Sequence, residues 1–291
     1  MDLRLVYDYK DDSVLRQSFN ELARTVFKFD LEGWYNSGYW TDMYVCHTLL
    51  DETRSVANVS VAKQEFLIEG VRKTALQVGT VMTHPEYRGK GLAGRLMEFV
   101  IERYRGSYDF MFLVANKSVL DFYPRYGFHR IGMNSFIWRP GSHSNPSASL
   151  RRLSPASPND LALIEGLSRD RVPVSPVFAP QKDWALLMFH LTGPFAEAIH
   201  YLPEHEALVV MSSENGRTEV FDVISPRPFR QAEILASALP SGTESVRLHL
   251  TPDGSLAGVV ASEWVAEDGL FIRPADFALP NPFCFSPLSQ S

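Results

Sequence analysis

The segment from Val78 to Met97 constrains the fold most, because it places a strand, a basic glycine-rich loop and a helix in immediate succession. It reads VGTVMTHPEYRGKGLAGRLM, with the strand ending near Thr83 and the helix opening near Gly91. Glycines permit positive φ and let a ligand approach the backbone closely. The N–H groups at the start of a helix attract anions, and Arg88 and Lys90 add positive charge. The segment therefore predicts a phosphate or pyrophosphate cradle at a strand-to-helix turn.

Three other interpretations compete for this loop. A Gly-Lys-Gly stretch by itself is also typical of a tight surface turn. A Walker A loop requires GxxxxGK[ST], and here both the spacing and the trailing Ser or Thr are missing. Gly89, Gly91 and Gly94 do spell GxGxxG, but the dinucleotide-binding motif opens a βαβ unit. The strands before this loop instead read as an antiparallel meander, which disfavours that interpretation.

Hydrophobic periodicity predicts the elements that surround the loop. A helix over 12–27 precedes strands over 55–62, 64–68 and 74–83, with a turn at Glu69-Gly70. After the loop come a helix over 92–104, a buried strand over 109–114, a short helix over 118–126 and closing strands within 128–138. The pattern indicates a mixed α+β fold, a mostly antiparallel sheet flanked by helices.

At this point the sequence resembles the GNAT acetyltransferase superfamily. The family's [Q/R]-x-x-G-x-[G/A], between its fourth strand and third helix, is matched by Arg88–Ala93. Its second hallmark, N-x-x-(A/V)-x-x-F-Y-x-x-x-G-F, is similar to Asn116–Phe128. The resemblance covers about residues 2–138 and implies a GNAT fold there. It also implies acetyl-CoA as co-substrate and no metal.

The resemblance assigns roles residue by residue. Backbone groups of the fourth strand would bond the pantetheine arm of acetyl-CoA, here Val81, Met82 and Thr83. Backbone N–H groups of the loop would hold the pyrophosphate, here Arg88, Gly89, Lys90, Gly91, Leu92, Ala93 and Gly94. Asn116 would contact the pantetheine or its neighbouring loop, and it also suits a helix cap. Tyr123 would protonate the departing thiolate as general acid, although packing beside Phe122 is its alternative role.

The resemblance does not identify the general base. Several amine acetyltransferases carry a glutamate eleven residues before the first motif residue, and here that position is Gln77. Substitutes are His84, Glu86 and Asp30, and ordered water relaying the proton is an equal alternative. His84 before proline is more often structural.

The segment 30–44, DLEGWYNSGYWTDMY, is unusually aromatic. The family's acceptor site is lined by the segment after the first helix, which is where this stretch falls. Aromatic walls with carboxylates suit a cationic amine through cation–π contacts and charge. The expected acceptor residues are Asp30, Trp34, Tyr35, Tyr39 and Trp40. The alternative is that these aromatics only pack a short helix pair against the sheet.

A Ser- and Pro-rich stretch over 139–159 predicts a linker between a domain over 1–138 and a second one over 160–291. The second part repeats the order strand, strand, helix, strand, with a hairpin turn at Glu214–Gly216. It resembles a degenerate, smaller GNAT-like domain, with an unrelated α+β domain as alternative. Its junction at 224–229 has prolines where a phosphate cradle needs N–H donors, so no CoA is expected there. Shaping of the acceptor site, docking or dimerisation are its remaining uses.

Composition bounds the remaining function classes. The 291 residues are 45% hydrophobic and 21% charged, typical of a globular protein. The net charge of −6 lies wholly in the second part and argues against nucleic-acid binding. Without a leader or a long apolar run, a cytoplasmic, membrane-free protein with two reduced cysteines is expected. The function predicted is N-acetylation of a primary amine of a small molecule or peptide by direct transfer; the alternative is a non-catalytic CoA-binding regulatory module.

Overall fold

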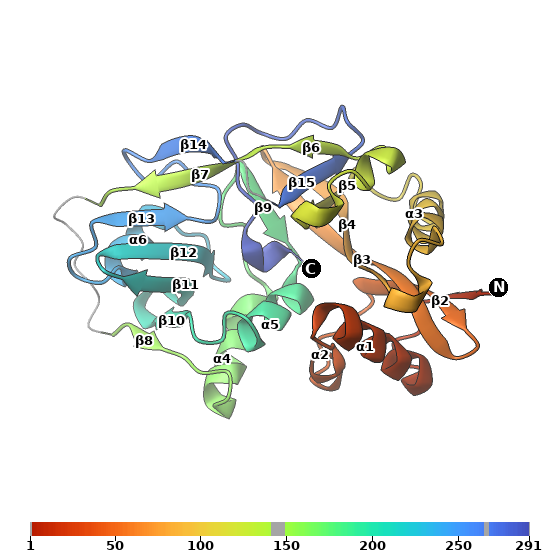
Figure 1. Ribbon diagram of the computed structural model, residues 1–291. Helices are drawn as coiled ribbons and strands as arrows, with labels where there is room; N and C mark the ends of the chain where they lie inside the picture. The colour runs from red at the N-terminus through yellow and green to blue at the C-terminus, as the bar shows by residue number, and fades with distance from the viewer. Residues whose placement is uncertain (1, 141–148, 265–267, 291) are drawn as a thin grey trace.

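The structure, a computed structural model, describes residues 2–140, 149–264 and 268–290 and contains two sheets side by side (Figure 1). The first sheet has eight strands and the second seven. Most neighbouring strands run antiparallel, and helices flank both sheets, so the predicted α+β class is confirmed. Within the described residues, no helix has the length and apolarity needed to cross a membrane. Both cysteines, Cys46 and Cys284, are buried free thiols.

The first sheet has the order β1-β2-β3-β4-β5-β15-β6, with β9 beside β3. Its strands are β1 (Arg4–Tyr7), β2 (Tyr44–Asp51), β3 (Arg54–Ile68), β4 (Val71–Thr83), β5 (Phe110–Ala115), β6 (His129–Ile131), β9 (Phe178–Gln181) and β15 (Gly269–Arg273). Strands β4 and β5 are parallel and are joined through helix α3 (Leu92–Arg103). The strands predicted over 55–62 and 64–68 are one continuous strand, β3.

Helices cover both faces of the first sheet. On one face α3 packs against Val45 and Val61, and on the other α1 (Ser13–Phe27) and α2 (Glu32–Asn36) pack against Cys46 and Ala62. Alternate residues of a strand point to opposite faces, which explains this division. Helix α1 begins as predicted, because the Asp12 carboxylate accepts hydrogen bonds from the first backbone N–H groups.

The second sheet has the order β8-β10-β11-β12-β13-β7-β14. Its strands are β7 (Met133–Trp138), β8 (Arg151–Arg152), β10 (Ile199–Leu202), β11 (Ala207–Glu214), β12 (Arg217–Ile224), β13 (Ser245–Leu248) and β14 (Val260–Trp264). Helix α6 (Gln231–Ala238) joins the parallel strands β12 and β13. The run β10-β11-β12-α6-β13 therefore repeats β2-β3-β4-α3-β5, which is the GNAT-like repetition expected from the sequence.

The two halves exchange a strand. Strand β7 follows β6 directly in the chain but lies between β13 and β14 in the second sheet. In return β15, from the end of the chain, lies between β5 and β6 in the first sheet. The expected closing strands of 128–138 thus divide between the sheets at Gly132. Periodicity identifies a strand but not its partner, so the predicted limits 1–138 and 160–291 do not coincide with the sheets.

The predicted linker, 139–159, is only partly covered, since 141–148 lie outside the described residues. Its described end contains β8 and the start of helix α4 (Pro158–Arg169), which is followed by α5 (Trp184–Thr192). The short 3₁₀ helices are η1 (Pro85–Tyr87), η2 (Lys117–Val119), η3 (Tyr123–Tyr126), η4 (Pro203–His205) and η5 (Pro287–Ser289).

The hydrophobic core runs through both halves. Aromatic rings of the first sheet, such as Phe66 and Phe112, stack on Phe178 and Phe285 of the later chain. A second part of the core packs α1 and α2 against α4 and α5. The side chains that bound the region between α2, β4 and α5 are therefore fixed by contacts from both halves.

Candidate functional site

Strands β4 and β5 separate partway along their length. Their parallel ladder joins Ala75, Leu76 and Gln77 to residues 110–112 of the neighbouring strand and ends there, although β4 continues to Thr83. Beyond Gln77 the edge of β4 that faces β5 therefore has backbone groups that are not used in the ladder. We call the region beyond the end of this ladder the β4–β5 gap; the pantetheine-binding residues expected from the sequence, Val81, Met82 and Thr83, lie along it.

A bulge in β4 shapes the same segment. The pairing of β3 with β4 shifts register between Asn58 and Ser60, and Thr80 has a left-handed φ of 46°. The Asn58 amide donates to the Thr80 carbonyl oxygen at 3.0 Å and to the Ser60 hydroxyl at 2.9 Å. A buried asparagine thus holds the bulge in place, which turns the β4 backbone at the point where the gap opens.

The loop after β4 leaves the start of α3 open. Gly89 and Gly91 have φ of 75° and 73°, which favours glycine, and a Cβ at either position would meet nothing within 4 Å. Gly91 is the N-cap of α3 and has no side chain to occupy the first N–H groups. Because α3 has twelve residues, its dipole adds to those N–H groups as an anion site.

The basic side chains and Gly94 frame this loop. The Lys90 ammonium lies 4.7 Å from the ring centre of Tyr87, and Arg88 Nε donates to the Thr83 carbonyl at 3.3 Å. At Gly94 a Cβ would lie 2.3 Å from the hydroxyl oxygen of Tyr126. Gly94 therefore allows α3 to pack closely against η3. This packing places the end of the second motif, where Tyr126 lies, beside the glycine loop.

Tyr123 is buried in the second motif, with 6% of its surface exposed. Its ring packs on Phe122 and on Phe271 of the exchanged strand β15, with centroids 5.1 and 5.8 Å apart. Burial raises its pKa to about 12, so the phenol keeps its proton at neutral pH. The hydroxyl makes no hydrogen bond to the described residues. Asn116 caps η2, its Oδ1 accepting from Ser118 N at 3.0 Å, which is the cap role expected for it.

Comparison with known protein families identifies this region. Residues 13–131 match the family model described as an acetyltransferase (GNAT) domain. Residues 13–131 therefore carry a GNAT acetyltransferase domain. The GNAT domain thus spans both motifs and the β4–β5 gap, while β15, which completes its sheet, lies outside the match.

Solved structures share the fold over almost the whole chain. A probable N-acyltransferase from Enterococcus faecalis is 14% identical with a TM-score of 0.59, covering 94% of this chain and 73% of its own. A GCN5-related N-acetyltransferase from Kribbella flavida is 16% identical with a TM-score of 0.56, covering 94% and 72%. Eis1 from Mycobacterium abscessus is 15% identical with a TM-score of 0.55, covering 92% and 72%. No curated protein matches the sequence.

Gln77, at the position of the missing glutamate, and two of the proposed substitute bases, His84 and Glu86, all have partners within the chain. Gln77 is buried in the GNAT domain, and its Oε1 accepts from Gln64 Nε2 at 2.8 Å. His84 caps η1 and lies 2.8 Å from the Arg54 guanidinium, which also pairs with Glu86 at 3.2 Å. His84 and Glu86, just after β4, are therefore both in contact with Arg54.

Asp30 is the remaining carboxylate among them. Its carboxylate is paired with Arg24 at 2.8 Å, and the hydrogen bond from Arg24 lowers its pKa. It also accepts from the backbone N–H of Glu32, two residues later, at 3.0 Å.

The aromatic segment forms much of the packing between the halves. Trp34, Tyr39 and Trp40 are all buried, and Trp34 Nε1 donates to the Ala185 carbonyl in the second half at 2.9 Å. The Tyr39 hydroxyl bonds Glu165 on α4, while Tyr35 stacks on the Arg16 guanidinium at 3.7 Å. The packing role weighed for these residues is therefore observed for each of them.

One of them, Trp34, also lines a small cavity of about 30 Å³ beside the bulge of β4. We call it the aromatic cavity; its lining is Phe29, Leu31, Trp34, Tyr44, Thr80, Leu186 and Phe189. Thr80 belongs to the β4 segment beyond the end of the β4–β5 ladder, so the cavity lies beside that segment. Leu186 and Phe189 come from α5 and were not expected at the site. The apolar run over 184–191 was the only signal for them.

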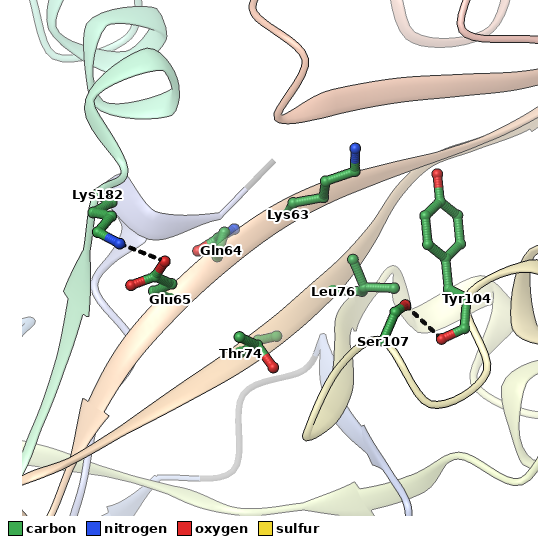
Figure 2. A pocket seen from close by; sticks show the side chains of 9 residues that line it. Lys63, Gln64, Glu65, Thr74, Leu76, Tyr104, Ser107 and Lys182 are labelled. Atoms are coloured by element: carbon green, nitrogen blue, oxygen red, sulfur yellow. Dashed lines mark hydrogen bonds and ion pairs between the residues drawn. The ribbon is translucent and has the colours of Figure 1, made fainter.

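A larger hollow of about 550 Å³ lies at the other end of β3 and β4 (Figure 2). Lys182 reaches Glu65 across it at 2.8 Å, and Ser107 donates to the Tyr104 carbonyl at its edge. It is lined by Lys63, Gln64, Glu65, Thr74, Ala75, Leu76, Tyr104, Ser107 and Lys182. None of these is a predicted site residue, so this hollow is separate from the predicted site.

Proposed function

We propose that the chain is an acetyl-CoA-dependent N-acetyltransferase that moves an acetyl group directly to a primary amine. The observation that carries this proposal is the end of the β4–β5 ladder at Gln77, because β4 continues past it toward the glycine loop and the start of α3. A thin acyl-pantetheine arm fits between separated strands, and a pyrophosphate fits a helix start. Both features lie inside the region that matches the GNAT domain.

The residues present fit acetyl-CoA. The positions Gly89 and Gly91 offer open space above the loop, where a bound phosphate would meet backbone and not side chains. Lys90 and Arg88 supply positive charge beside it. In the second half the corresponding helix start is already used, because Asp253 accepts from Gln231 N at 2.8 Å and Ser255 accepts from Ala232 N at 3.0 Å. A carboxylate there opposes a phosphate, so we propose one acetyl-CoA per chain.

When bound, acetyl-CoA supplies an acyl thioester, and the chain's own groups act around it. Backbone N–H groups of β4 beyond Gln77 polarise the acyl oxygen as the oxyanion forms. Tyr123 holds a proton on its buried hydroxyl for the departing sulfur. Much of the rate comes from holding the amine and the thioester together.

Acetyl-CoA binding by calorimetry tests the proposal, with two matched glycine variants. Gly91→Ala and Gly106→Ala place a Cβ at nearly the same φ, 73° and 75°, and neither Cβ meets an atom within 4 Å. Both carry the same backbone strain of about 1 kcal/mol. We expect Gly91→Ala alone to weaken binding, since it alone stands at the start of α3. Absence of binding to the unchanged protein, or equal loss in both variants, refutes the site.

A non-catalytic CoA-binding module is the second candidate. The observation in its favour is Gln77, a neutral amide where several amine acetyltransferases carry a glutamate base. Such a module would bind acetyl-CoA with the same loop dependence but release no CoA with any amine. Thiol release in a panel of amines separates the two candidates.

A further inference from the structure

The aromatic cavity offers an acceptor no charge. Of the described residues that line it, all are uncharged, and the polar groups among them are the Tyr44 and Thr80 hydroxyls, which bond each other, and the Trp34 N–H. That N–H is already committed to the Ala185 carbonyl. Burial raises the pKa of Tyr44, so its phenol stays neutral. An ammonium group entering this cavity would lose its hydration without gaining a counter-charge.

The carboxylates close in sequence to the cavity lining have partners within the chain. On the loop before α2 and on α2, Asp30 pairs with Arg24 and Glu32 with Arg16. On α5, Asp183 is buried against Arg171 at 2.6 Å. These carboxylates are therefore paired with arginines of the chain itself. The attraction that the sequence suggested between this segment and a cationic acceptor is already used within the chain.

Two further titratable groups on these elements are His190 and Cys46. His190 on α5 holds the Gln290 carbonyl at 2.6 Å, and burial lowers its pKa, so it is neutral at pH 7. Cys46 on β2 is a buried thiol whose pKa burial raises to about 12.

From this lining we infer that the acceptor is a weakly basic, apolar amine, of the aromatic amine class, one edge of whose ring enters the aromatic cavity. This inference rests on the proposed function and narrows its substrate. An aromatic amine is already neutral at pH 7, so it needs no base to become a nucleophile. The cavity of about 30 Å³ admits part of a ring and excludes a sugar or a polycationic chain in this form of the site.

The walls suit a flat ring. Trp34 packs edge-on against Tyr44 and Phe189, with centroids 5.5 and 5.9 Å apart, and stacks on Trp40 at 5.9 Å. These contacts fix the wall before an acceptor arrives, which reduces the ordering cost of binding. Aromatic pairs of this geometry prefer further edge-to-face neighbours, which an aromatic acceptor supplies.

The transfer balances without a protein base. The lone pair of the neutral amine forms a C–N bond to the acyl carbon, and the C–S bond breaks with its pair going to sulfur. Tyr123 gives its proton to that thiolate. The nitrogen, now positively charged and strongly acidic, loses its proton to water, and water returns a proton to Tyr123. The products are the acetylated amine and free CoA.

Two isomeric amines test the inference, p-toluidine and benzylamine, with spermidine as a polycation. CoA release is followed from pH 6 to 9. For benzylamine kcat/KM should rise about tenfold per pH unit, because each unit increases the neutral fraction tenfold below the amine's pKa. For p-toluidine it should stay flat across this range and exceed both other amines at pH 7. Phe189→Ala should lower kcat/KM for p-toluidine about tenfold or more, mainly through KM.

Control variants keep the test specific. Phe195→Ala removes a ring that packs on Phe221 and His190 outside the cavity and should leave kcat/KM for p-toluidine unchanged. Phe189→Leu keeps an apolar side chain should Phe189→Ala fail to fold, and it should retain most activity. The inference is overturned, while acetyl transfer stands, if spermidine is the best acceptor. It is also overturned if kcat/KM for p-toluidine varies with pH and is lost in His190→Gln. Absence of both acetyl-CoA binding and transfer to every amine removes the proposed function as well.

Discussion

Phe271→Ala should destabilise the GNAT domain although residue 271 lies 140 residues beyond the end of the family match. Phe271 is the centre of the exchanged strand β15, is 1% exposed and packs on Tyr123. Removal of a fully buried phenyl ring leaves a cavity and costs about 3–5 kcal/mol. That is a large part of the roughly 5–15 kcal/mol by which a domain is stable.

The assay is urea unfolding followed by tryptophan fluorescence, with acetyl-CoA binding measured on the same samples. Val260→Ala is the control, because Val260 also lies on a strand after residue 250 but is 57% exposed. Its change should stay within about 0.5 kcal/mol. We expect the Phe271 variant to unfold at lower urea and to lose acetyl-CoA binding over the same range.

A chain ending at residue 140 gives the stronger form of the same test. It lacks β15, so the β5 edge that pairs with Leu270–Ile272 would stand open, and β6 would lose its neighbour. Unpaired edges of this kind favour aggregation. A soluble, cooperatively folding 1–140 fragment that binds acetyl-CoA as tightly as the full chain would refute the reasoning.

Three further predictions follow from individual contacts. Tyr123→Phe should lower kcat by about 10²–10⁴-fold, as for loss of a general acid, with unchanged acetyl-CoA affinity in calorimetry; with a pKa of about 12, the wild-type tyrosine should lose no activity through its own ionisation below pH 10. Arg171→Ala leaves Asp183 and Asp222 buried without their cation, and unfolding should show a loss of about 3–5 kcal/mol. Because burial raises the pKa of Asp222, that loss should shrink as the pH falls and Asp222 is protonated. Calorimetry of the full chain should give one acetyl-CoA per molecule; two would refute our assignment of the second half.

Local features of the fold could be predicted from the sequence. The helix after Asp12, the β3–β4 turn at Glu69-Gly70 and the hairpin turn at Asn215-Gly216 were all found where capping and turn residues place them. The glycine loop is likewise a local property, since Gly89 and Gly91 need only their own φ values. Such signals depend on neighbours within a few residues, which a single sequence contains.

The pairing of strands and the walls of the site could not be predicted in the same way. Residues 133–138 have the pattern of a strand, but which sheet they join depends on the strand at 269–273, more than 130 residues later. Leu186 and Phe189 lie in an apolar run that fits either a helix or a strand, and their place at the cavity arises only when α5 packs against α2 and β4. The carboxylates of the aromatic segment appeared available because their partners, Arg16 and Arg24, lie one helix earlier.

The strand exchange explains how the second half, for which we propose no CoA site, can still contribute to the proposed active site. If the halves were joined by a linker alone, the second could drift from the first, and the aromatic cavity would lose Leu186 and Phe189. Strand β15, from the end of the chain, instead places Phe271 against Tyr123 in the first sheet. Strand β7, which follows β6 in the chain, is held in the second sheet by its pairing with β13. Each half therefore supplies a strand to the sheet of the other. The same exchange holds both the proposed acid, Tyr123, and the proposed acceptor wall on α5. Because separation of the halves would break both sheets, the geometry between donor and acceptor is as stable as the fold itself.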